Sequence, residues 1–388
     1  MSRLEELIQE LCPEGVEYRR VDEICDISRG KVMSKDFIQA NEGEYPVYSS
    51  QTENDGELGR ISSYAYDGEY LTWTTDGANA GSVFYRKGKF SITNVCGLLK
   101  VNTDDVITRY IFHTLQVEAP KYVNKGMGNP KLMSNVMARI KLAVPPLEVQ
   151  REIVRILDSF TLLTAELTAE LTARKKQYEF YRDELLKPKA NIPVVKLKEI
   201  ATIVRGGNFQ KKDFIENGRP CIHYGQMYTH FGIAAKKTFT FINEEVFAKS
   251  KIAKPGDIVM AVTSENVEDV CSCTAWLGDE DIAISGHTAI ISHNQNPKFL
   301  SYYFHSVMFF DQKKKLAHGT KVIEVTPSKL GDIVIMLPTI EEQNRIVSIL
   351  DRFDSLCNSI SEGLPAEIEA RQKQYEFYRD KLLTFKQL

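Results

Sequence analysis

The sequence predicts an α+β protein with an internal tandem duplication, in which two long antiparallel helices separate two globular α/β domains. Three observations predict this fold. The block at 173–186 returns at 370–383 with 12 of 14 positions identical, and the block at 145–160 returns at 338–353. Each block has helical apolar spacing, and the segment before it contains short β-type runs bounded by turn residues. Pseudo-twofold symmetry between the two halves follows from the duplication.

The matching residues are 193 positions apart in the block at 145–160 and 197 apart in the block at 173–186, so the later copy carries four extra residues. Weaker echoes precede each block, at 110–115 and 302–307 and at 21–30 and 197–206. The predicted organisation is an N-terminal helix at 1–14, globular domains at 15–142 and 190–336, and helical regions at 143–189 and 337–388.

The repeated blocks predict long helices at about 147–187 and 339–385, because their apolar residues recur every three or four positions. Gly363 and Pro365 predict a kink or a short break in the second helix. The first helix ends where the second domain begins, so helices whose apolar seams pack together must be antiparallel, with the domains at opposite ends. Ser2 and Glu5 form a capping-box pattern, and we expect the N-terminal helix to pack near the end of the second long helix.

The globular domains are expected to contain several short strands with helices between them. Predicted strands lie at 69–75, 82–86, 90–101, 237–242, 257–264, 281–292 and 332–337, and short helices at 106–117 and 298–310.

The composition is that of an ordinary globular protein, with 43% hydrophobic and 26% charged residues among 388. No apolar run is long enough for a membrane span, and the first residues do not resemble a signal peptide. Seven scattered cysteines predict reduced thiols in a cytoplasm. The formal net charge of -3 means that any surface that binds nucleic acid must be a local patch.

The sequence lacks the common catalytic motifs. It has no GxxxxGK[ST], no Glu-x-Lys, no Asn- or Asp-Pro-Pro-aromatic string, no HExxH and no GxSxG. Cys271, Cys273, His287 and His293 are the most tempting metal ligands, but two thiols on one buried strand face is the favoured interpretation. The carboxylate pairs Asp213–Glu216 and Asp76–Glu69 are interpreted as caps or solvated residues. We therefore expect no catalytic residue, no metal and no cofactor in this chain.

Three kinds of segment could bind DNA: basic loops that contain glycine, polar runs with aromatic residues, and the loop before each long helix. Glycine allows close approach to a phosphate, Lys and Arg neutralise it, and Asn and Gln can read adenine edges. Similar loops in both halves suggest a duplicated role. The candidate DNA contacts are Arg29, Lys31, Ser49, Ser50, Gln51, Trp73, Thr74, Asn79, Lys125, Asn129, Lys131, Arg205, Asn208, Lys211, Lys212, His223, Tyr224, Gln226, Tyr228, Lys313, Lys314, Thr320 and Lys321.

With these features, the whole chain resembles a specificity subunit of a type I restriction-modification system. The resemblance is carried by the repeated 145–160 and 338–353 blocks, the repeated QYEFYRD and the glycine-containing loop before each helix. One departure is Glu148-Val149-Gln150, where the second copy has Glu341-Glu342-Gln343 and the family favours Glu-Gln. The resemblance implies a non-enzymatic chain with two target-recognition domains, each of which reads one half of a split site in double-stranded DNA.

It further implies that the helical regions dock two modification subunits, which carry the S-adenosylmethionine chemistry, and that a separate motor subunit translocates and cleaves DNA with ATP and Mg²⁺. A coiled-coil scaffold and a stand-alone DNA-modifying enzyme remain the alternatives. The candidates for helix pairing and partner docking are Gln150, Ile153, Leu157, Phe160, Tyr178, Tyr181, Gln343, Ile346, Leu350, Phe353, Tyr375 and Tyr378.

Overall fold

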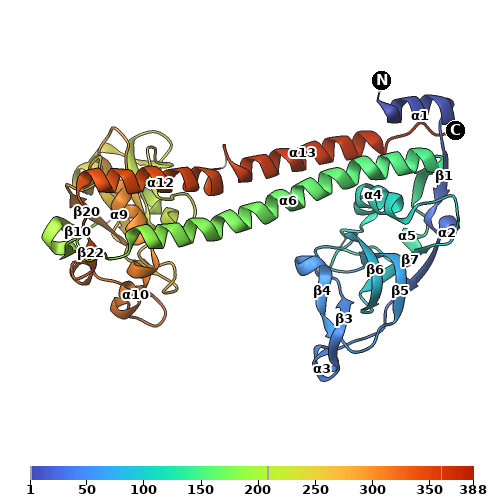
Figure 1. Ribbon diagram of the computed structural model, residues 1–388, viewed down its shortest axis with the longest axis horizontal. Helices are drawn as coiled ribbons and strands as arrows, with labels where there is room; N and C mark the ends of the chain where they lie inside the picture. Colours follow the sequence, from blue (N-terminus) through green and yellow to red (C-terminus); the bar gives the residue numbers. More distant parts are fainter. Residues whose placement is uncertain (1, 127, 208, 360) are drawn as a thin grey trace. The chain divides into compact units, whose positions relative to one another are not determined.

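The computed structural model describes residues 2–126, 128–207, 209–359 and 361–388. The chain divides into two compact units: unit 1 is Met1–Leu167 with Glu367–Leu388, and unit 2 is Thr168–Ala366. Helix α6, Leu147–Leu186, contributes its first part to unit 1 and its second part to unit 2 (Figure 1). Each unit therefore holds one globular domain and one pair of helical segments, which confirms the predicted duplication.

Unit 1 is built around a six-stranded sheet of order β2-β7-β5-β6-β3-β4 and a separate antiparallel pair, β1-β8. Its strands are β1 (Glu17–Arg20), β2 (Cys25–Arg29), β3 (Glu42–Tyr48), β4 (Glu57–Ile61), β5 (Tyr66–Thr74), β6 (Val83–Ile92), β7 (Cys96–Val101) and β8 (Lys141–Val144). Its helices are α1 (Arg3–Leu11), α2 (Val21–Ile24), α3 (Lys35–Ala40), α4 (Thr108–Glu118), α5 (Ser134–Met137), most of α13 (Leu364–Leu382), and the 3-10 turns η1 (Glu53–Gly56) and η2 (Ala119–Tyr122).

Unit 2 contains two five-stranded sheets, β10-β20-β16-β18-β13 and β11-β14-β12-β19-β15, and the pairs β22-β9 and β17-β21. Its strands are β9 (Val194–Lys196), β10 (Ala201–Arg205), β11 (Phe214–Ile215), β12 (Arg219–Ile222), β13 (Ala234–Ala235), β14 (Thr240–Ile242), β15 (Lys251–Ala253), β16 (Ile258–Ala261), β17 (Thr263–Ser264), β18 (Cys273–Trp276), β19 (Ile282–Ile284), β20 (Thr288–His293), β21 (Ile323–Glu324) and β22 (Val334–Met336). Its helices are α7 (Leu197–Ile200), α8 (Glu244–Lys249), α9 (Pro297–Phe304), α10 (Val307–Leu316), α11 (Pro327–Leu330), α12 (Ile340–Asn358), and the 3-10 turns η3 (Lys211–Asp213) and η4 (Tyr224–Tyr228).

One strand explains why unit 1 has a single large sheet. β6 pairs antiparallel with β5 and parallel with β3, so it joins both halves of the sheet. The sequence predicted a break at 87–89, and this is wrong, because Gly88 pairs with Gly68 and the ladder continues. In unit 2 two strands take the place of β6: β18 pairs antiparallel with β16, and β19 pairs parallel with β12. The chain between them folds back over Trp276, whose Nε1 donates to Glu280 O, and the sheet divides there.

The predicted helix pairing is confirmed by two matching aromatic stacks. Phe160 of α6 stacks on Tyr378 of α13 in unit 1, with centroids 5.6 Å apart, and Phe353 of α12 stacks on Tyr181 of α6 in unit 2, with centroids 5.5 Å apart. In unit 2 the two helices run antiparallel. Cys357, near the end of α12, lies close enough to Lys175 of α6 for their charges to interact, whereas Glu342, near the start of α12, is close enough to interact in this way with Lys189, just beyond the end of α6.

The predicted interruption of the second long helix is also confirmed. α12 ends at Asn358 and α13 begins at Leu364. Gly363 has a φ of +83°, and a Cβ at this position would lie 2.5 Å from the carbonyl oxygen of Ser355. Only glycine fits such a left-handed, crowded position without strain. The four extra residues of the second copy lie between its two repeated blocks, at 354–369, and the break falls within this segment.

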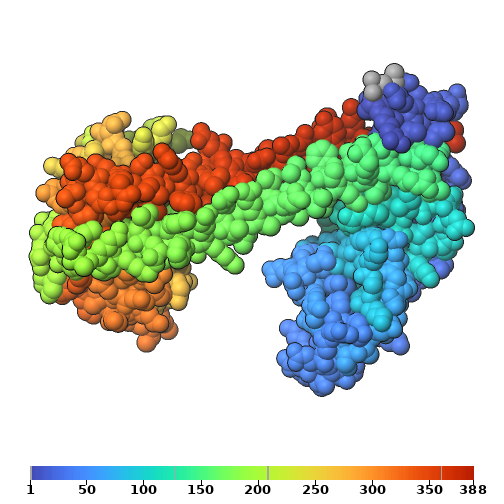
Figure 2. Space-filling view, in the orientation of Figure 1, coloured from blue at the N-terminus to red at the C-terminus, as the bar shows by residue number. Residues whose placement is uncertain are grey.

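Both chain ends lie in unit 1. The capping box at Ser2 and Glu5 is present, and Leu4 is buried in a cluster that the end of α13 also joins. Figure 2 shows α1 packed against the start of α6. Val16 N donates to Lys386 O at 2.9 Å, and the backbone of Gln387 bridges to Val16. These contacts confirm the expected packing of α1.

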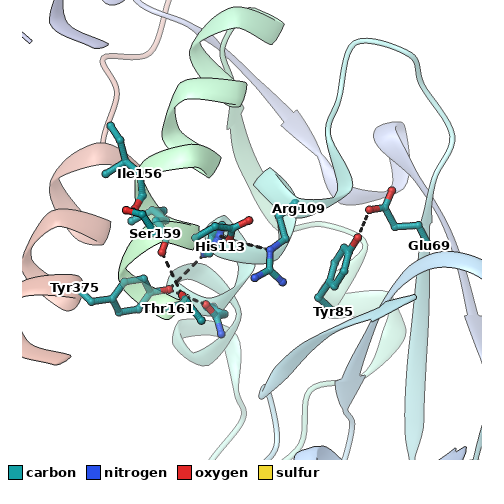
Figure 3. Close-up of polar contacts among 11 residues, drawn as sticks. Glu69, Tyr85, Arg109, His113, Ile156, Ser159, Thr161 and Tyr375 are labelled. Carbon is teal, nitrogen blue, oxygen red and sulfur yellow. Dashed lines mark hydrogen bonds and ion pairs between the residues drawn. The ribbon is translucent and has the colours of Figure 1, made fainter. Parts of the chain in front are cut away.

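A buried polar network ties the globular domain of unit 1 to its helices (Figure 3). His113 of α4 is fully buried, with Nε2 2.9 Å from Asp158 of α6 and Nδ1 3.3 Å from the Tyr375 hydroxyl of α13. Burial lowers the pKa of His113 despite its bond to Asp158. Burial alone would raise the pKa of Asp158, but hydrogen bonds from His113 and Arg109 outweigh it and lower that pKa. The network thus contains a neutral imidazole at neutral pH.

Replacing His113 should change how stability depends on pH. A His pKa that is lowered on folding means that the unfolded chain binds more protons, so wild-type stability falls as pH drops below about 6.5. His113→Asn has no imidazole to protonate, so it lacks this loss of stability at low pH. It also loses a buried hydrogen bond worth about 1–3 kcal/mol. The variant should therefore be least stable relative to wild type above pH 6.5, and the gap should narrow at lower pH. Urea unfolding between pH 5 and 8 measures this, with exposed His230→Asn as control; a gap that is constant with pH would contradict it.

Candidate nucleic-acid interface

Four of the predicted segments meet at one end of the sheet in unit 1. Arg29, at the end of β2, donates from Nη2 to the Thr75 hydroxyl at 2.7 Å. Thr75 O accepts the backbone N–H of Leu132, which draws the 125–131 loop against the end of β5. The 48–54 loop joins them, since Asn79 Nδ2 donates to the Thr52 hydroxyl at 3.1 Å. The structure therefore brings together loops that are up to about a hundred residues apart in sequence.

This surface is polar, and the carboxylate of Asp76 lies between two basic side chains. Asp76 lies 3.6 Å from the Arg29 guanidinium and 3.7 Å from the Lys131 ammonium. A cleft of about 340 Å³ lies beside them, lined by Asn124, Gly126, Gly128, Asn129 and Lys131. Lys31, Lys125 and Asn129 are exposed. Amide, ammonium and guanidinium groups on exposed loops can donate to phosphates and to base edges.

The matching end of unit 2 gathers the corresponding loops. Arg205, at the end of β10, donates from Nη1 to Glu324 at 2.7 Å and from Nε to Gly286 O at 2.9 Å. Tyr228 donates to Thr263 O, and Tyr224 N donates to the Ser285 hydroxyl. The 318–321 loop is held by paired backbone hydrogen bonds between residues 318 and 324. Lys211, Lys212, Lys314, Thr320 and Lys321 are exposed, whereas Asn208 lies outside the described residues.

Four candidate DNA contacts are corrected by their burial. Trp73 is fully buried, and its Nε1 donates to Leu132 O. Thr74 is also fully buried and donates to Asn79 O. His223 is buried and accepts the N–H of Gly225 at the start of η4. These three side chains support the loops rather than reach DNA. Ser49 and Gln51 are half-buried, with bonds to Thr93 and Glu57 O, and Ser50 and Gln226 are half-buried as well.

Lys313 is the fourth correction. Its ammonium is buried and donates to the carbonyl oxygens of Glu268 and Val270, at 2.8 and 2.6 Å. Burial lowers the pKa of Lys313. The sequence could not indicate this role, because Lys313 lies in a run of three lysines of which Lys314 and Lys315 are exposed.

Lysine variants should separate surface contacts from this internal one. We expect Lys31→Ala or Lys321→Ala to weaken DNA binding across all sequences and to reduce the slope of log K against log salt by about 1, as the loss of one phosphate contact would. Lys313→Met should leave both the affinity and the slope unchanged. Fluorescence anisotropy at several salt concentrations, on protein checked for folding by circular dichroism, measures this. A change of slope with Lys313→Met, or sequence-selective loss with the other two, would contradict the assignment.

The candidates on the helical regions also divide into two groups. Phe160, Tyr181, Phe353 and Tyr378 pair the helices, as described above, and Tyr178 lies 6.5 Å from Phe353. The four aliphatic candidates are fully buried and hold each helix to its own domain, so a partner subunit cannot reach them; they are Ile153, Leu157, Ile346 and Leu350. Tyr375 is half-buried, and its hydroxyl lies 3.3 Å from His113 Nδ1.

Gln150 and Gln343 are likewise corrected from docking to internal positions. Gln150 accepts from Ile107 N and donates to Pro145 O, and Gln343 accepts from Asn296 N and donates to Pro338 O. Each glutamine therefore fixes the start of its helix to the loop before the short helix of its domain.

The side chains considered for catalysis or metal binding do not come together in one site. Cys271 and Cys273 are buried, and burial raises the pKa of each thiol to about 12, although only Cys273 lies on a strand. Asp213 caps η3, which confirms its interpretation as a cap. Asp76 pairs with basic residues and not with Glu69. Within the described residues, no group of three or more His, Cys, Asp or Glu side chains could hold a metal ion.

The sequence assigned no DNA contact to several residues at the centre of this surface. Thr75 and Asp76 in unit 1, and Thr263, His287 and Glu324 in unit 2, contact the two arginines or each other. Their signal was weak, because the residues that correspond in the two units differ in type.

Comparison with known proteins assigns the chain to a family. The model of the type I restriction modification DNA specificity domain matches residues 13–174 and again 190–370. The chain therefore belongs to this family, with one copy of the domain in each half. Among the described residues, every helix is too short or too polar to cross a bilayer.

Individual relatives agree. A protein assigned as a type I specificity subunit in Mycoplasma pneumoniae is 33% identical over 376 residues, covering 94% of this chain and 97% of its own length. A second, an N-terminal part of such a subunit from the same organism, is 53% identical over 178 residues, covering 44% of this chain and 95% of its own.

Two solved structures share the fold. One, described under complex assembly of the type I restriction-modification system, has a TM-score of 0.63 at 18% identity and covers 96% of this chain and 98% of its own. The other, the S subunit from M. genitalium, has a TM-score of 0.53 at 13% identity and covers 95% of each chain.

Proposed function

We propose that this chain is the DNA-recognition subunit of a type I restriction-modification complex. Each globular domain reads one half of a bipartite, non-palindromic target in double-stranded DNA, with unread bases between the halves. The observation that carries this proposal is the convergence of matching loops on Arg29 in unit 1 and Arg205 in unit 2. Two similar surfaces with different side chains suit two different half-sites.

The helical regions set the spacing and dock two modification subunits. Support comes from the near-identical blocks at 173–186 and 370–383, which keep exposed residues such as Phe180 and Phe377 as well as buried ones. In this proposal the chain is not catalytic and binds no cofactor. S-adenosylmethionine, ATP and Mg²⁺ belong to the modification subunits and to a restriction and translocation subunit.

A scaffold without DNA binding and a self-contained DNA-modifying enzyme are the alternatives. A scaffold gives no reason for two polar loop surfaces built at the same end of each domain. A self-contained enzyme requires reactive groups, whereas Cys271 and Cys273 are held as buried thiols.

The test is to incubate the purified chain with genomic DNA, with and without the modification subunit, in the presence of S-adenosylmethionine. We expect no methylation by the chain alone and, with the partner, methylation at one bipartite motif in a methylome measurement. Methylation or Mg²⁺-dependent cleavage by the chain alone would overturn the proposal. So would a complex that methylates one continuous motif or no defined motif.

A further inference from the structure

The two units place the same arginine at the same point of the candidate interface. Arg29 ends β2 and Arg205 ends β10, and a glycine follows each. In both units that glycine donates its N–H to the first residue of the neighbouring strand, β7 or β20. Both guanidinium side chains are partly exposed, at 36% and 45%.

The residues around the arginine correspond in position but not in type. The backbone contacts of the two units show which residues correspond. Asp76 bridges to Lys131 in unit 1 as Thr263 does to Glu324 in unit 2, and the carbonyl oxygens of Val95 and His287 accept the matching backbone N–H groups. None of the three positions has the same residue in both units, although the backbone bonds that hold them are the same.

One of these differences is an exchange of the acid that holds the arginine. In unit 1 the carboxylate beside Arg29 is Asp76, and its other neighbour is Lys131. In unit 2 the carboxylate on Arg205 is Glu324, which stands at the position of Lys131. The arginine is thus oriented by an acid in both units. The charges of the residues around it differ, because Asp76 and Lys131 balance each other in unit 1, whereas Glu324 has no such partner among the corresponding residues of unit 2.

At the position of Val95, unit 2 has His287, whose imidazole can donate a hydrogen bond. His287 is exposed, with Nδ1 3.1 Å from the Thr263 hydroxyl and its ring 4.9 Å from the ring of Tyr224. When the Thr263 hydroxyl donates to Nδ1, the proton lies on Nε2, which no described side chain engages. Unit 1 has Val95 at this position, which cannot donate.

From this pattern we infer a division of labour within each recognition surface. Arg29 and Arg205 contact DNA phosphate, and the two flanking positions that reach the surface, Lys131 or Glu324 and Val95 or His287, determine which half-site each domain reads. Thr263 is buried and orients His287. The inference rests on the proposed function. A residue that is the same in two domains cannot distinguish two different half-sites, so it contacts what both share. Residues that replace one another on an unchanged backbone can distinguish them.

The chemistry of the flanking residues is specific enough to test. An Nε2–H on His287 and the ammonium of Lys131 are donors for the acceptors of a purine edge, such as guanine O6 and N7. Glu324 accepts, as the amino group of cytosine requires. Val95 offers only apolar contact, as to a thymine methyl group.

The arginine half is tested by Arg29→Gln and Arg205→Gln in the full chain, assembled with its modification subunit. Each should reduce DNA binding about tenfold and lower the salt slope by about 1, with the methylated motif unchanged. Arg29→Lys and Arg205→Lys should stay within about threefold of wild type, since they keep the charge. Lys100→Gln in unit 1 and Lys237→Gln in unit 2, at the opposite ends of the sheets, are the matched controls.

The flanking half is tested by His287→Val and Lys131→Glu, which each install the residue of the other unit. Each should change the methylated motif at one or two positions of a single half-site, with Lys100→Glu as control. For variants that no longer support methylation, binding to oligonucleotides substituted at each position should show discrimination lost about tenfold at those positions alone. An altered motif with either arginine variant, or uniform weakening with both flanking variants, would overturn the inference. A wild-type chain that gives no bipartite motif would instead overturn the proposed function.

Discussion

Exchanging the globular domain of unit 1 for that of a relative is expected to change one half of the recognised sequence completely and leave the other half intact. The structure shows where to join the chains. β1 pairs with β8 immediately outside the exchanged segment, and Val21 N donates to Ile140 O where the ladder ends. Joints at 21 and 140 therefore keep this ladder, whereas an exchange of 15–142 would cut β8. Methylome sequencing of cells that carry the chimera and the modification subunit reads the result.

The reciprocal exchange uses the matching joints of unit 2. β9 pairs with β22, and Leu197 N donates to Ile333 O, so residues 197–333 form the corresponding segment. This second chimera should alter the other half-site. If either exchange altered both halves, the two domains would not read DNA independently, and the division between them would be wrong.

The repeated sequence predicted the helices well because their determinants are local. The spacing of apolar residues placed α6 within a residue of its observed ends, and Gly363 with Pro365 placed the break before α13. The strands were harder, because the glycine at position 88 reads as a turn in sequence. It is extended by pairing with Gly68, a partner that only the folded sheet supplies.

The candidate interface was predicted at the level of loops but not of side chains. The loops were found because glycine and basic residues mark them. Whether a given side chain faces solvent depends on contacts that are distant in sequence: Trp73 is covered by Leu132, and Lys313 is drawn inward by two carbonyl oxygens on the 268–270 turn. The pairing of Arg29 with Asp76 and of Arg205 with Glu324 likewise depends on residues 47 and 119 positions away.

Replacing both Phe180 and Phe377 with serine is expected to prevent the modification subunits from joining the complex, with the fold and DNA binding retained. The two residues occupy the same position of the repeated block, and they are 61% and 64% exposed. Each ring lies nearly perpendicular to the ring of the neighbouring tyrosine, with centroids 5.5 Å apart for Phe180 and Tyr181 and 5.4 Å apart for Phe377 and Tyr378. Exposed substitutions of this kind change stability by about 0.5 kcal/mol or less.

An exposed phenylalanine that is kept in both copies, while the domains around it diverge, is what a docking contact used twice requires. Burying one such ring contributes about 1.5–3 kcal/mol, so each serine should weaken its own docking site by roughly ten- to a hundredfold. Native mass spectrometry should then show one modification subunit bound to Phe180→Ser or Phe377→Ser, and none bound to the double variant. Phe239→Ser is the matched control, because Phe239 is 58% exposed but lies outside the repeated blocks. A double variant that still binds two subunits, or a control that loses them, would show that docking uses another surface.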